Sequence, residues 1–248
     1  MVTGASSGIG AEFARALAAR GSDLVLVARR EDRLTTLAKE LEQIHGIHCR
    51  TVAWDLSKES SGRRLRDVVP EQIDLVVNNA GFAVQGPFAD GDADDFERLI
   101  AVDIRAVVDI CSAFLPDMID RSTGTIVNVA STTAFQPVPS LAVYAAAKAF
   151  VLSFSQSLWY EAAQHEVRVF ALNPGPTRTE FFDVIGDTAA AAGSYQTPTE
   201  VVATAMRILD ARRSRPQVIS GRRNTVQAIA ASLVPARVLL PTLARMLH

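Results

Sequence analysis

Cysteine is scarce in this chain: Cys49 and Cys111 are the only two among 248 residues. Two thiols cannot form a disulfide framework, and these two lack the spacing of metal ligands, so the sequence predicts neither a disulfide-stapled fold nor a metal site. Cys49 falls in a predicted strand and Cys111 in a predicted helix. We expect both to be small core side chains.

Long apolar runs and a surplus of either charge are also missing. No stretch offers about 20 uninterrupted apolar residues, so we predict no transmembrane helix. The first residues lack the basic and apolar regions of a signal peptide. The formal net charge is −2, without the basic surplus of nucleic-acid-binding proteins. We therefore expect a cytoplasmic protein with no nucleic-acid partner.

Short apolar runs instead alternate with helical patterns along the chain. A strand stub at residues 1–3 precedes runs at residues 24–28, 48–53, 74–78, 125–130, 167–172 and 217–220. Helical patterns separate them, including those at residues 31–44, 57–69, 92–121, 143–165 and 200–212. This order predicts an α/β fold: one Rossmann-type domain over residues 1–221, with a doubly wound parallel sheet of about seven strands and helices on both faces.

A glycine-rich turn follows the first strand stub. It reads Gly4-Ala5-Ser6-Ser7-Gly8-Ile9-Gly10 and leads into a helical pattern. Strand, glycine turn and helix together present backbone N–H groups and a positive helix end to a phosphate. The spacing G-x-x-x-G-x-G differs from the commonest dinucleotide fingerprint. Its position between a strand and a helix nevertheless favours phosphate binding over a plain turn.

Arg29 and Arg30 come directly after the strand at residues 24–28. In a doubly wound sheet this position faces the adenosine ribose of a dinucleotide, where an acidic residue binds the 2′-hydroxyl and an arginine suits a 2′-phosphate. The nearest acidic residues, Glu31 and Asp32, begin the next helix. We predict NADP(H) in preference to NAD(H), against the alternative that both arginines are simply solvated.

Candidate ligand-binding residues also follow four further strands. They are Asp55, Asn79, Ser131 and Pro174. The carboxyl ends of parallel strands share one edge of a sheet, and ligands bind there. Because unrelated surface residues would scatter over both edges, this shared location is the main residue-based argument for a site. The adjacent Asn78 and Asn79 could bond either a ligand or the neighbouring strands.

Tyr144 and Lys148 are four residues apart, which places both on one face of a helix. A nearby ammonium favours the phenolate and lowers the phenol pKa from its usual value of about 10, so Tyr144 becomes a usable general acid or base. Ser131 precedes a proline-containing loop and could hydrogen-bond the oxygen of a carbonyl or alcohol. Such a Tyr–Lys pair alone is typical of a solvated or packed helix face. The candidate residues at the carboxyl ends of the strands shift the interpretation toward catalysis.

Two segments near the C-terminus have less regular patterns. Residues 181–198 have no clear period and are long for a connection, so we predict a substrate loop at about residues 176–198. Residues 222–248 form an apolar helical extension, in which Pro241 predicts a helix start or break nearby. Its apolar stripes consist of Val226, Ile229, Ala230 and Leu233, and of Leu239, Leu240, Leu243 and Leu247. We expect these helices to cover the core or a subunit partner, with peripheral membrane contact as the alternative.

Together these motifs resemble those of the short-chain dehydrogenases/reductases. Thr3 to Gly10 resembles the family's T-G-x-x-x-G-x-G cofactor motif, and residues 78–81 match its N-N-A-G. Ser131, with Tyr144-Ala145-Ala146-Ala147-Lys148, matches its serine and Y-x-x-x-K. Pro174-Gly175 with Thr177 matches the segment that closes over the nicotinamide. The resemblance covers about residues 1–220, and within the family the chain is similar to NADP-preferring bacterial members.

The resemblance implies an oxidoreductase that interconverts a carbonyl and an alcohol by hydride transfer. Tyr144 would exchange a proton with the substrate oxygen, Lys148 would lower its pKa and hold the nicotinamide ribose, and Ser131 would orient the substrate. Asp55 and Leu56 would flank the adenine. The candidate cofactor-binding residues are Gly4, Ser6, Ser7, Gly8, Ile9, Arg29, Arg30, Asp55, Leu56, Asn79, Ala80, Gly81, Tyr144, Lys148, Pro174, Gly175 and Thr177.

Asp103 departs from the family pattern, which has asparagine in the helix before the catalytic strand, where a water-linked proton path starts. We count it among the catalytic candidates. If the backbone carbonyl is the key group there, aspartate can substitute for asparagine, whereas an ionised Asp103 near Lys148 could hold the ammonium too tightly. A second departure is the short first strand. It implies either residues upstream of Met1 or a locally weakened sheet.

Two other functions fit the same fold. One is a non-catalytic nucleotide-binding, redox-sensing protein, against which the intact Ser131, Tyr144 and Lys148 argue; the other is non-redox chemistry. The candidate residues of the pocket wall are Phe82, Gln136, Val138 and Phe181. Because they are mostly apolar, they suggest a lipophilic or mid-sized carbonyl substrate. The resemblance and the broad apolar surface of the helix after Tyr144 predict a homodimer or homotetramer.

Overall fold

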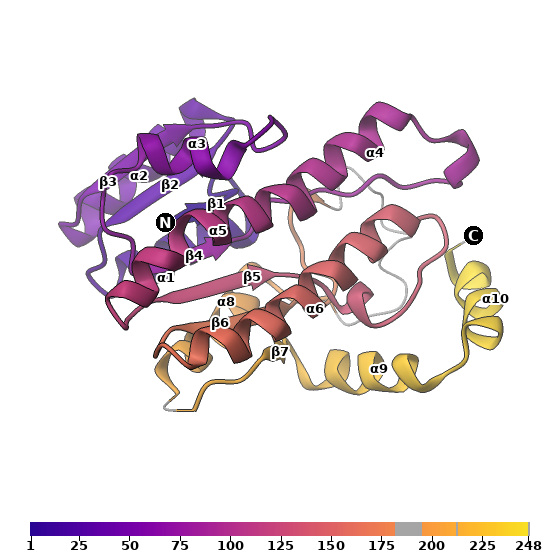
Figure 1. The fold of residues 1–248 in the computed structure, drawn as a ribbon. Coiled ribbons are helices and arrows are strands. Elements are labelled where there is room, and N and C mark those ends of the chain that lie inside the picture. The colour runs from indigo at the N-terminus through magenta and orange to yellow at the C-terminus, as the bar shows by residue number, and fades with distance from the viewer. Residues whose placement is uncertain (182–194, 212, 248) are drawn as a thin grey trace.

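One parallel sheet forms the centre of the protein. The computed structural model describes residues 1–181, 195–211 and 213–247. Across these residues, seven strands pair in the order β3-β2-β1-β4-β5-β6-β7 (Figure 1). They are β1 Val2–Thr3, β2 Leu24–Ala28, β3 Cys49–Ala53, β4 Leu75–Asn78, β5 Thr125–Val129, β6 Arg168–Asn173 and β7 Gln217–Ile219. The predicted α/β, doubly wound fold is confirmed.

The order of the strands reverses beside β1. Val2 pairs in parallel with Leu26 of β2 on one side and with Val77 of β4 on the other. The chain builds β1, β2 and β3 outward in one direction and then returns to add β4 to β7 on the opposite side of β1. A crevice beyond the carboxyl ends of the strands at such a reversal is where open α/β sheets bind ligands.

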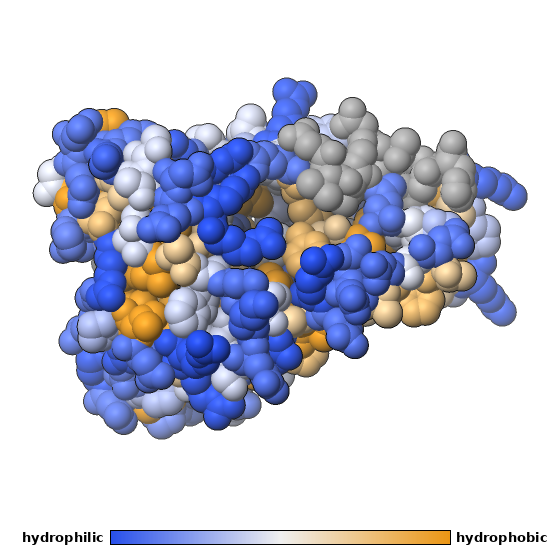
Figure 2. Space-filling model, turned by 90° about the horizontal axis from the view of Figure 1, so that it is seen from above, coloured by the Kyte–Doolittle hydropathy of each residue, from blue (hydrophilic) through white to orange (hydrophobic). Residues whose placement is uncertain are grey.

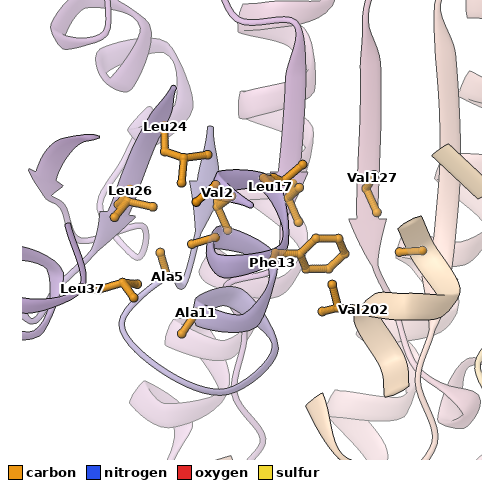
Figure 3. Close-up of a cluster of buried hydrophobic side chains, with 14 of the residues drawn as sticks. Val2, Ala5, Ala11, Phe13, Leu17, Leu24, Leu26, Leu37, Val127 and Val202 are labelled. Carbon is orange, nitrogen blue, oxygen red and sulfur yellow. The ribbon is translucent and has the colours of Figure 1, made fainter. Parts of the chain in front are cut away.

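Helices cover both faces of the sheet. One layer holds α1 Gly8–Ala18, α2 Glu31–His45 and α8 Pro198–Asp210, and the other holds α3 Ser61–Val68, α5 Ala106–Asp120 and α6 Ala142–Ala163. Phe13 of α1 is fully buried and points toward Val127 of the sheet and Val202 of α8 (Figure 3). All five residues of β2 are buried, as its wholly apolar sequence requires of a strand covered on both faces.

Two predicted helices have different bounds. The helix expected at residues 57–69 begins only at Ser61, because the carboxylate of Asp55 accepts hydrogen bonds from the N–H (3.0 Å) and the hydroxyl (2.8 Å) of Ser57 and holds that segment in a turn. Residues 92–121 form α4 Ala93–Ile100 and α5, as predicted, but they are joined without a break by the π-helical turn η2 Ala101–Arg105. This turn carries Asp103.

The C-terminal extension consists of α9 Arg222–Leu233 and α10 Ala236–Leu247, which extend away from the sheet (Figure 1). The sequence predicts a helix start or a break near Pro241. The helix α10 begins at Ala236 and continues through Pro241, so there is no break at this proline. The predicted stripe of α9 faces solvent and does not cover the core: Val226, Ile229 and Leu233 are exposed.

Several other expectations concern the surface and the ends of the chain. Cys49 and Cys111 are buried, as predicted. Within the described residues, no helix combines the length and apolar character needed to cross a membrane. The face shown in Figure 2 is largely hydrophilic, with hydrophobic side chains visible in its recesses. Most of the predicted substrate loop, residues 182–194, lies outside the described residues.

Candidate active site

A cavity of about 790 Å³ opens beyond the carboxyl ends of the strands. It is lined by the glycine turn, by the segments that follow β2 to β6, and by one face of α6. The predicted residues found in its lining are Gly4, Ser6, Ser7, Gly8, Ile9, Arg29, Arg30, Asp55, Leu56, Asn79, Ala80, Gly81, Ser131, Tyr144, Lys148, Pro174, Gly175 and Thr177. The structure therefore brings together every predicted site residue except Asp103. Asp103 does not line the cavity but lies beside two residues that do, Gly81 and Lys148.

The glycine turn brings the backbone close to the cavity. Gly4 and Gly8 have φ angles of +65° and +55°, which side chains rarely tolerate. A Cβ on Gly10 would lie 2.3 Å from the carbonyl oxygen of Gly4, so only glycine fits there. Ser7 caps α1 without a side-chain hydrogen bond to it. The first N–H groups of the helix therefore remain available to an anion, which fits the pyrophosphate of a dinucleotide.

Arg29 and Arg30 have different surroundings at the end of β2. The guanidinium of Arg30 donates to the hydroxyl oxygens of Ser6 (3.0 Å) and Ser7 (2.8 Å) and pairs with Glu180 (2.8 Å). It thus braces the glycine turn and leaves both serine O–H groups able to donate to a phosphate. Arg29 is exposed at the cavity edge, close enough to Asp55 to help lower the pKa of that carboxylate.

The two adjacent asparagines bond neighbouring strands. The amide nitrogen of Asn79 donates to the carbonyl oxygen of Thr3 (2.9 Å), and its backbone N–H donates to the Thr3 hydroxyl (2.9 Å). Asn78 is buried and donates to the side-chain oxygen of Asn128 on β5 (2.9 Å). Asn79 lines the cavity as well, whereas Asn78 holds the sheet together beneath it.

Ser131, Tyr144 and Lys148 meet on one wall of the cavity. Ser131 lies two residues after the end of β5 and caps the 3-10 turn η3 Thr132–Phe135, where its hydroxyl oxygen accepts the N–H of Thr133 (3.1 Å). Tyr144 and Lys148 share one face of α6, with the ammonium 5.5 Å from the centre of the phenol ring. The ammonium also donates to the carbonyl oxygen of Val129 (3.2 Å), which fixes α6 against β5.

Asp103 pairs directly with Lys148. Its Oδ2 lies 3.0 Å from the lysine Nζ, its Oδ1 accepts the N–H of Phe82 (3.1 Å), and its side chain is fully buried. A Cβ on Gly81 would lie 3.0 Å from both carboxylate oxygens, so glycine at this position leaves room for the pair. The π-helical turn brings this carboxylate to the lysine, in keeping with the frequent occurrence of such turns at functional sites.

Burial decides the direction of the pKa shift for Tyr144 and Asp103, but not for Lys148. It raises the pKa of Tyr144 and Asp103 adds to the rise, while Lys148 and a hydrogen bond with Ser131 offset part of it. Burial likewise raises the pKa of Asp103 against the pull of Lys148. Burial alone would lower the pKa of Lys148, but Asp103 and Tyr144 together raise it. Lys148 does lower the pKa of Tyr144, as predicted, but burial outweighs this effect and the net shift of that pKa is upward.

The substrate end of the cavity is mostly apolar. Phe181 stacks obliquely on Tyr144, with ring centres 5.5 Å apart, and Phe82 lies on the cavity wall as predicted. Gln136 and Val138 do not belong to the lining, so their prediction as pocket walls is wrong. Val138 turns instead into the apolar cluster behind Tyr144, because the loop before α6 folds inward there.

The sequence reasoning missed several lining residues. Trp54 and Arg98 line the cavity, as do Thr179 and Glu180, and Thr179 lies over Gly8. Trp54 could have been found from its place at the end of the third strand, beside Asp55. Nothing in the local pattern identifies Glu180, whose partners Arg30 and Arg33 are far away in the sequence.

Comparisons with known proteins agree with this arrangement. The short chain dehydrogenase family model matches residues 1–190. A sulfoacetaldehyde reductase of Chromohalobacter salexigens is 38% identical over 82% of this chain and 82% of its own length. The structure of a short-chain dehydrogenase from Sphingobium yanoikuyae in complex with NADPH is 34% identical and superposes with a TM-score of 0.84, covering 92% of this chain and 90% of that one.

A second solved structure shares the fold at lower identity. The bulky-bulky ketone specific alcohol dehydrogenase from Comamonas testosteroni is 27% identical, with a TM-score of 0.79 over 94% of this chain and 93% of that one. Together with the extent of the family match, these likenesses settle the family and the reaction class. The chain belongs to the short-chain dehydrogenases/reductases and is an oxidoreductase that acts on carbonyl and alcohol groups.

Proposed function

We propose that this enzyme uses NADP(H) and that Tyr144 is its general acid and base. The observation that carries the proposal is the convergence of Ser131, Tyr144 and Lys148 on one wall of a cavity that also holds the glycine turn and Arg29. A protein that only bound or sensed the nucleotide would have no need of the first three.

A nicotinamide held in this cavity would supply or accept the hydride, and the side chains of the protein would transfer the proton. In reduction, the hydroxyls of Ser131 and Tyr144 hold the carbonyl oxygen of the substrate, and Tyr144 gives this oxygen its proton. The ammonium of Lys148 then stabilises the phenolate. In oxidation the phenolate takes the proton of the alcohol. Because the phenol is buried, the charge that develops there is screened little by water, and the paired lysine has a large effect.

The preference for NADP(H) rests on Arg29. It is an exposed cation at the carboxyl end of β2, where the 2′ position of the adenosine ribose lies in this fold. The guanidinium of Arg30 is already engaged by Ser6, Ser7 and Glu180. Arg30 therefore contributes to cofactor binding by holding the glycine turn in place. The NADPH bound in the Sphingobium yanoikuyae structure is consistent with the same cofactor here.

We propose an aldehyde or ketone with an apolar substituent as the substrate. Phe82, Ala83, Leu141 and Phe181 line the cavity near Tyr144 and present no charged group to the substrate. The named relatives reduce an aldehyde or act on bulky ketones, which frames the range of compounds to be screened.

The deciding experiment compares wild type with Tyr144→Phe. A panel of aldehydes, ketones and alcohols is screened by nicotinamide absorbance with both cofactors. We expect wild-type turnover, a loss of at least about 100-fold in the variant, and NADPH binding by fluorescence that stays within about threefold of wild type. Retained turnover would remove Tyr144 from the mechanism, and a wild type that binds NADPH but turns over no compound would favour the redox-sensing alternative.

We also propose a catalytic domain at residues 1–221, a helical extension at residues 222–248 and a cytoplasmic homodimer or homotetramer. Exposed aromatic side chains on α6 support the assembly: Phe150 is 41% exposed and stacks on Phe154, and Tyr160 is 66% exposed. Light scattering after size exclusion measures the assembly directly, and a monomer would contradict it.

A further inference from the structure

The charges of this chain are divided unequally along its length. Residues 211–248 contain seven of the 25 basic residues, all arginine, and none of the 27 acidic ones. This leaves a formal charge of +7 on the last 38 residues and −9 on the first 210, although the whole chain carries only −2. The arginines carried by α9 and α10 are Arg222, Arg223, Arg237 and Arg245, and all four are exposed.

The helix α9 presents its apolar side to solvent. Val226, Ile229 and Leu233 recur at helical spacing on one stripe and are 68%, 52% and 78% exposed. The side that faces the body of the protein carries Asn224 and Ala228, which are buried. A helix that served only to cover the core would have the opposite arrangement, with large apolar residues inward.

Exposed apolar side chains also occur at the start of the next helix. Val234 and Val238 are 37% and 56% exposed, and they follow Leu233 at the junction of α9 and α10. We call Val226, Ile229, Leu233, Val234 and Val238 the arm surface. Arg222 lies at one end of it, and Arg237 and Arg245 lie at the other. Figure 1 shows both helices at the margin of the molecule, and all five side chains of the arm surface are exposed to solvent.

We propose that the arm surface docks on an anionic phospholipid bilayer, with its apolar side chains at the headgroup boundary and its arginines on the lipid phosphates. Exposed apolar residues flanked by basic ones on a helix are the pattern of peripheral membrane helices. Anionic lipids attract such a basic segment. A two-fold contact between the arms of two subunits is disfavoured, because it would bring together two arms that each carry four arginines and no acidic residue. The proposal does not depend on the assigned cofactor or reaction.

Vesicle cosedimentation tests the proposal on the full-length protein. Vesicles of phosphatidylcholine alone are compared with vesicles that contain an equal part of phosphatidylglycerol. We expect binding to the anionic vesicles, weaker binding at high salt, and little binding to phosphatidylcholine alone. Absence of binding to the anionic vesicles would overturn the proposal.

Variants locate the binding surface. The triple variant Val226→Ser, Ile229→Ser, Leu233→Ser and the double variant Arg222→Gln, Arg223→Gln should each lower the partition coefficient roughly tenfold. The controls are Ile44→Ser, an equally exposed apolar residue on α2, and Arg63→Gln on α3. Both should bind as wild type does, and thermal melting checks that all variants fold. Equal losses of vesicle binding in the controls would overturn the assignment of the surface. A triple variant that keeps vesicle binding but becomes monomeric would also overturn it, because the surface would then be a subunit interface.

Discussion

At the scale of single residues, Asp103 sets this site apart from the usual family arrangement. Its carboxylate lies 3.0 Å from the ammonium of Lys148, and both side chains are buried, that of Asp103 completely. The pair keeps Lys148 charged, but the negative charge also opposes formation of the Tyr144 phenolate. Aspartate therefore steadies the lysine at the cost of a higher pKa for the phenol.

Asp103→Asn should lower the pKa of Tyr144. The carboxylate contributes to raising this pKa, so its removal shifts the balance downward. Alcohol oxidation requires the phenolate and increases as pH rises through this pKa. We expect the midpoint of its pH profile to move down, with activity at neutral pH kept or raised. Asp120→Asn, the same charge change on the exposed end of α5, should not move the midpoint. A more than tenfold loss at every pH would show that the carboxylate has a role of its own.

Arg29→Ala should weaken binding of NADPH far more than that of NADH. A hydrogen-bonded ion contact with a phosphate contributes about 1.5–3 kcal/mol, which is roughly tenfold to a hundredfold in Kd. Isothermal titration with both cofactors measures the difference, and Arg63→Ala, an exposed arginine outside the cavity, is the matched control. Equal losses for the two cofactors would remove the 2′-phosphate assignment.

At the scale of secondary-structure elements, a row of buried polar side chains aligns α6, which carries Tyr144 and Lys148, with the sheet. Asn78 of β4 donates to Asn128 of β5 (2.9 Å), and Asn128 donates to the hydroxyl of Ser155 on α6 (2.9 Å). All three residues are buried. Buried polar groups need specific hydrogen-bond partners, so these three side chains fix how α6 packs on β4 and β5. The position of Tyr144 on α6 follows from this packing.

Asn128→Ala should destabilise the protein by about 3 kcal/mol. The substitution leaves buried polar atoms of Asn78 and Ser155 without their partner and opens a small cavity. Urea unfolding should show a lower midpoint with an unchanged slope. Gln43→Ala, at an exposed position of α2, should change stability by less than about 0.5 kcal/mol. A wild-type midpoint for Asn128→Ala would mean that this row of polar side chains does not contribute to stability.

At the scale of the whole molecule, ion pairs join two segments beside the cavity that lie far apart in the chain. Glu180, in the segment after β6, pairs with Arg30 (2.8 Å) and with Arg33 of α2. Arg33 and Arg30 lower the pKa of Glu180 from 4.5 to about 2. The stabilisation from this pair is therefore complete above about pH 4.5 and is lost as the pH falls toward 2. At neutral pH these ion pairs tie the segment after β6, in which Thr179 lies over Gly8, to the start of α2.

Glu180→Gln should speed dissociation of NADPH and NADH alike. An exposed pair of this kind is worth at most about 1 kcal/mol, or up to about fivefold in rate. Stopped-flow displacement measures the rates, and Glu40→Gln, which removes a surface pair with Arg15 away from the cavity, is the control. Tighter binding of NADPH alone would contradict the proposal that the Glu180 ion pairs slow cofactor dissociation. It would show that the carboxylate competes with the cofactor phosphate for Arg30.

The sequence by itself determined the order of elements, the parallel sheet and the edge at which the site lies. Those features depend on local periodicity and on the rule that parallel strands end together, so Ser131, Tyr144 and the glycine turn could be placed without coordinates. Only the tertiary structure decided the net direction of the Tyr144 pKa, the pairing of Glu180, the loss of Gln136 from the pocket wall and the outward face of α9. Each of these depends on burial and on contacts between segments that lie far apart in the chain, and a local pattern carries no information about either.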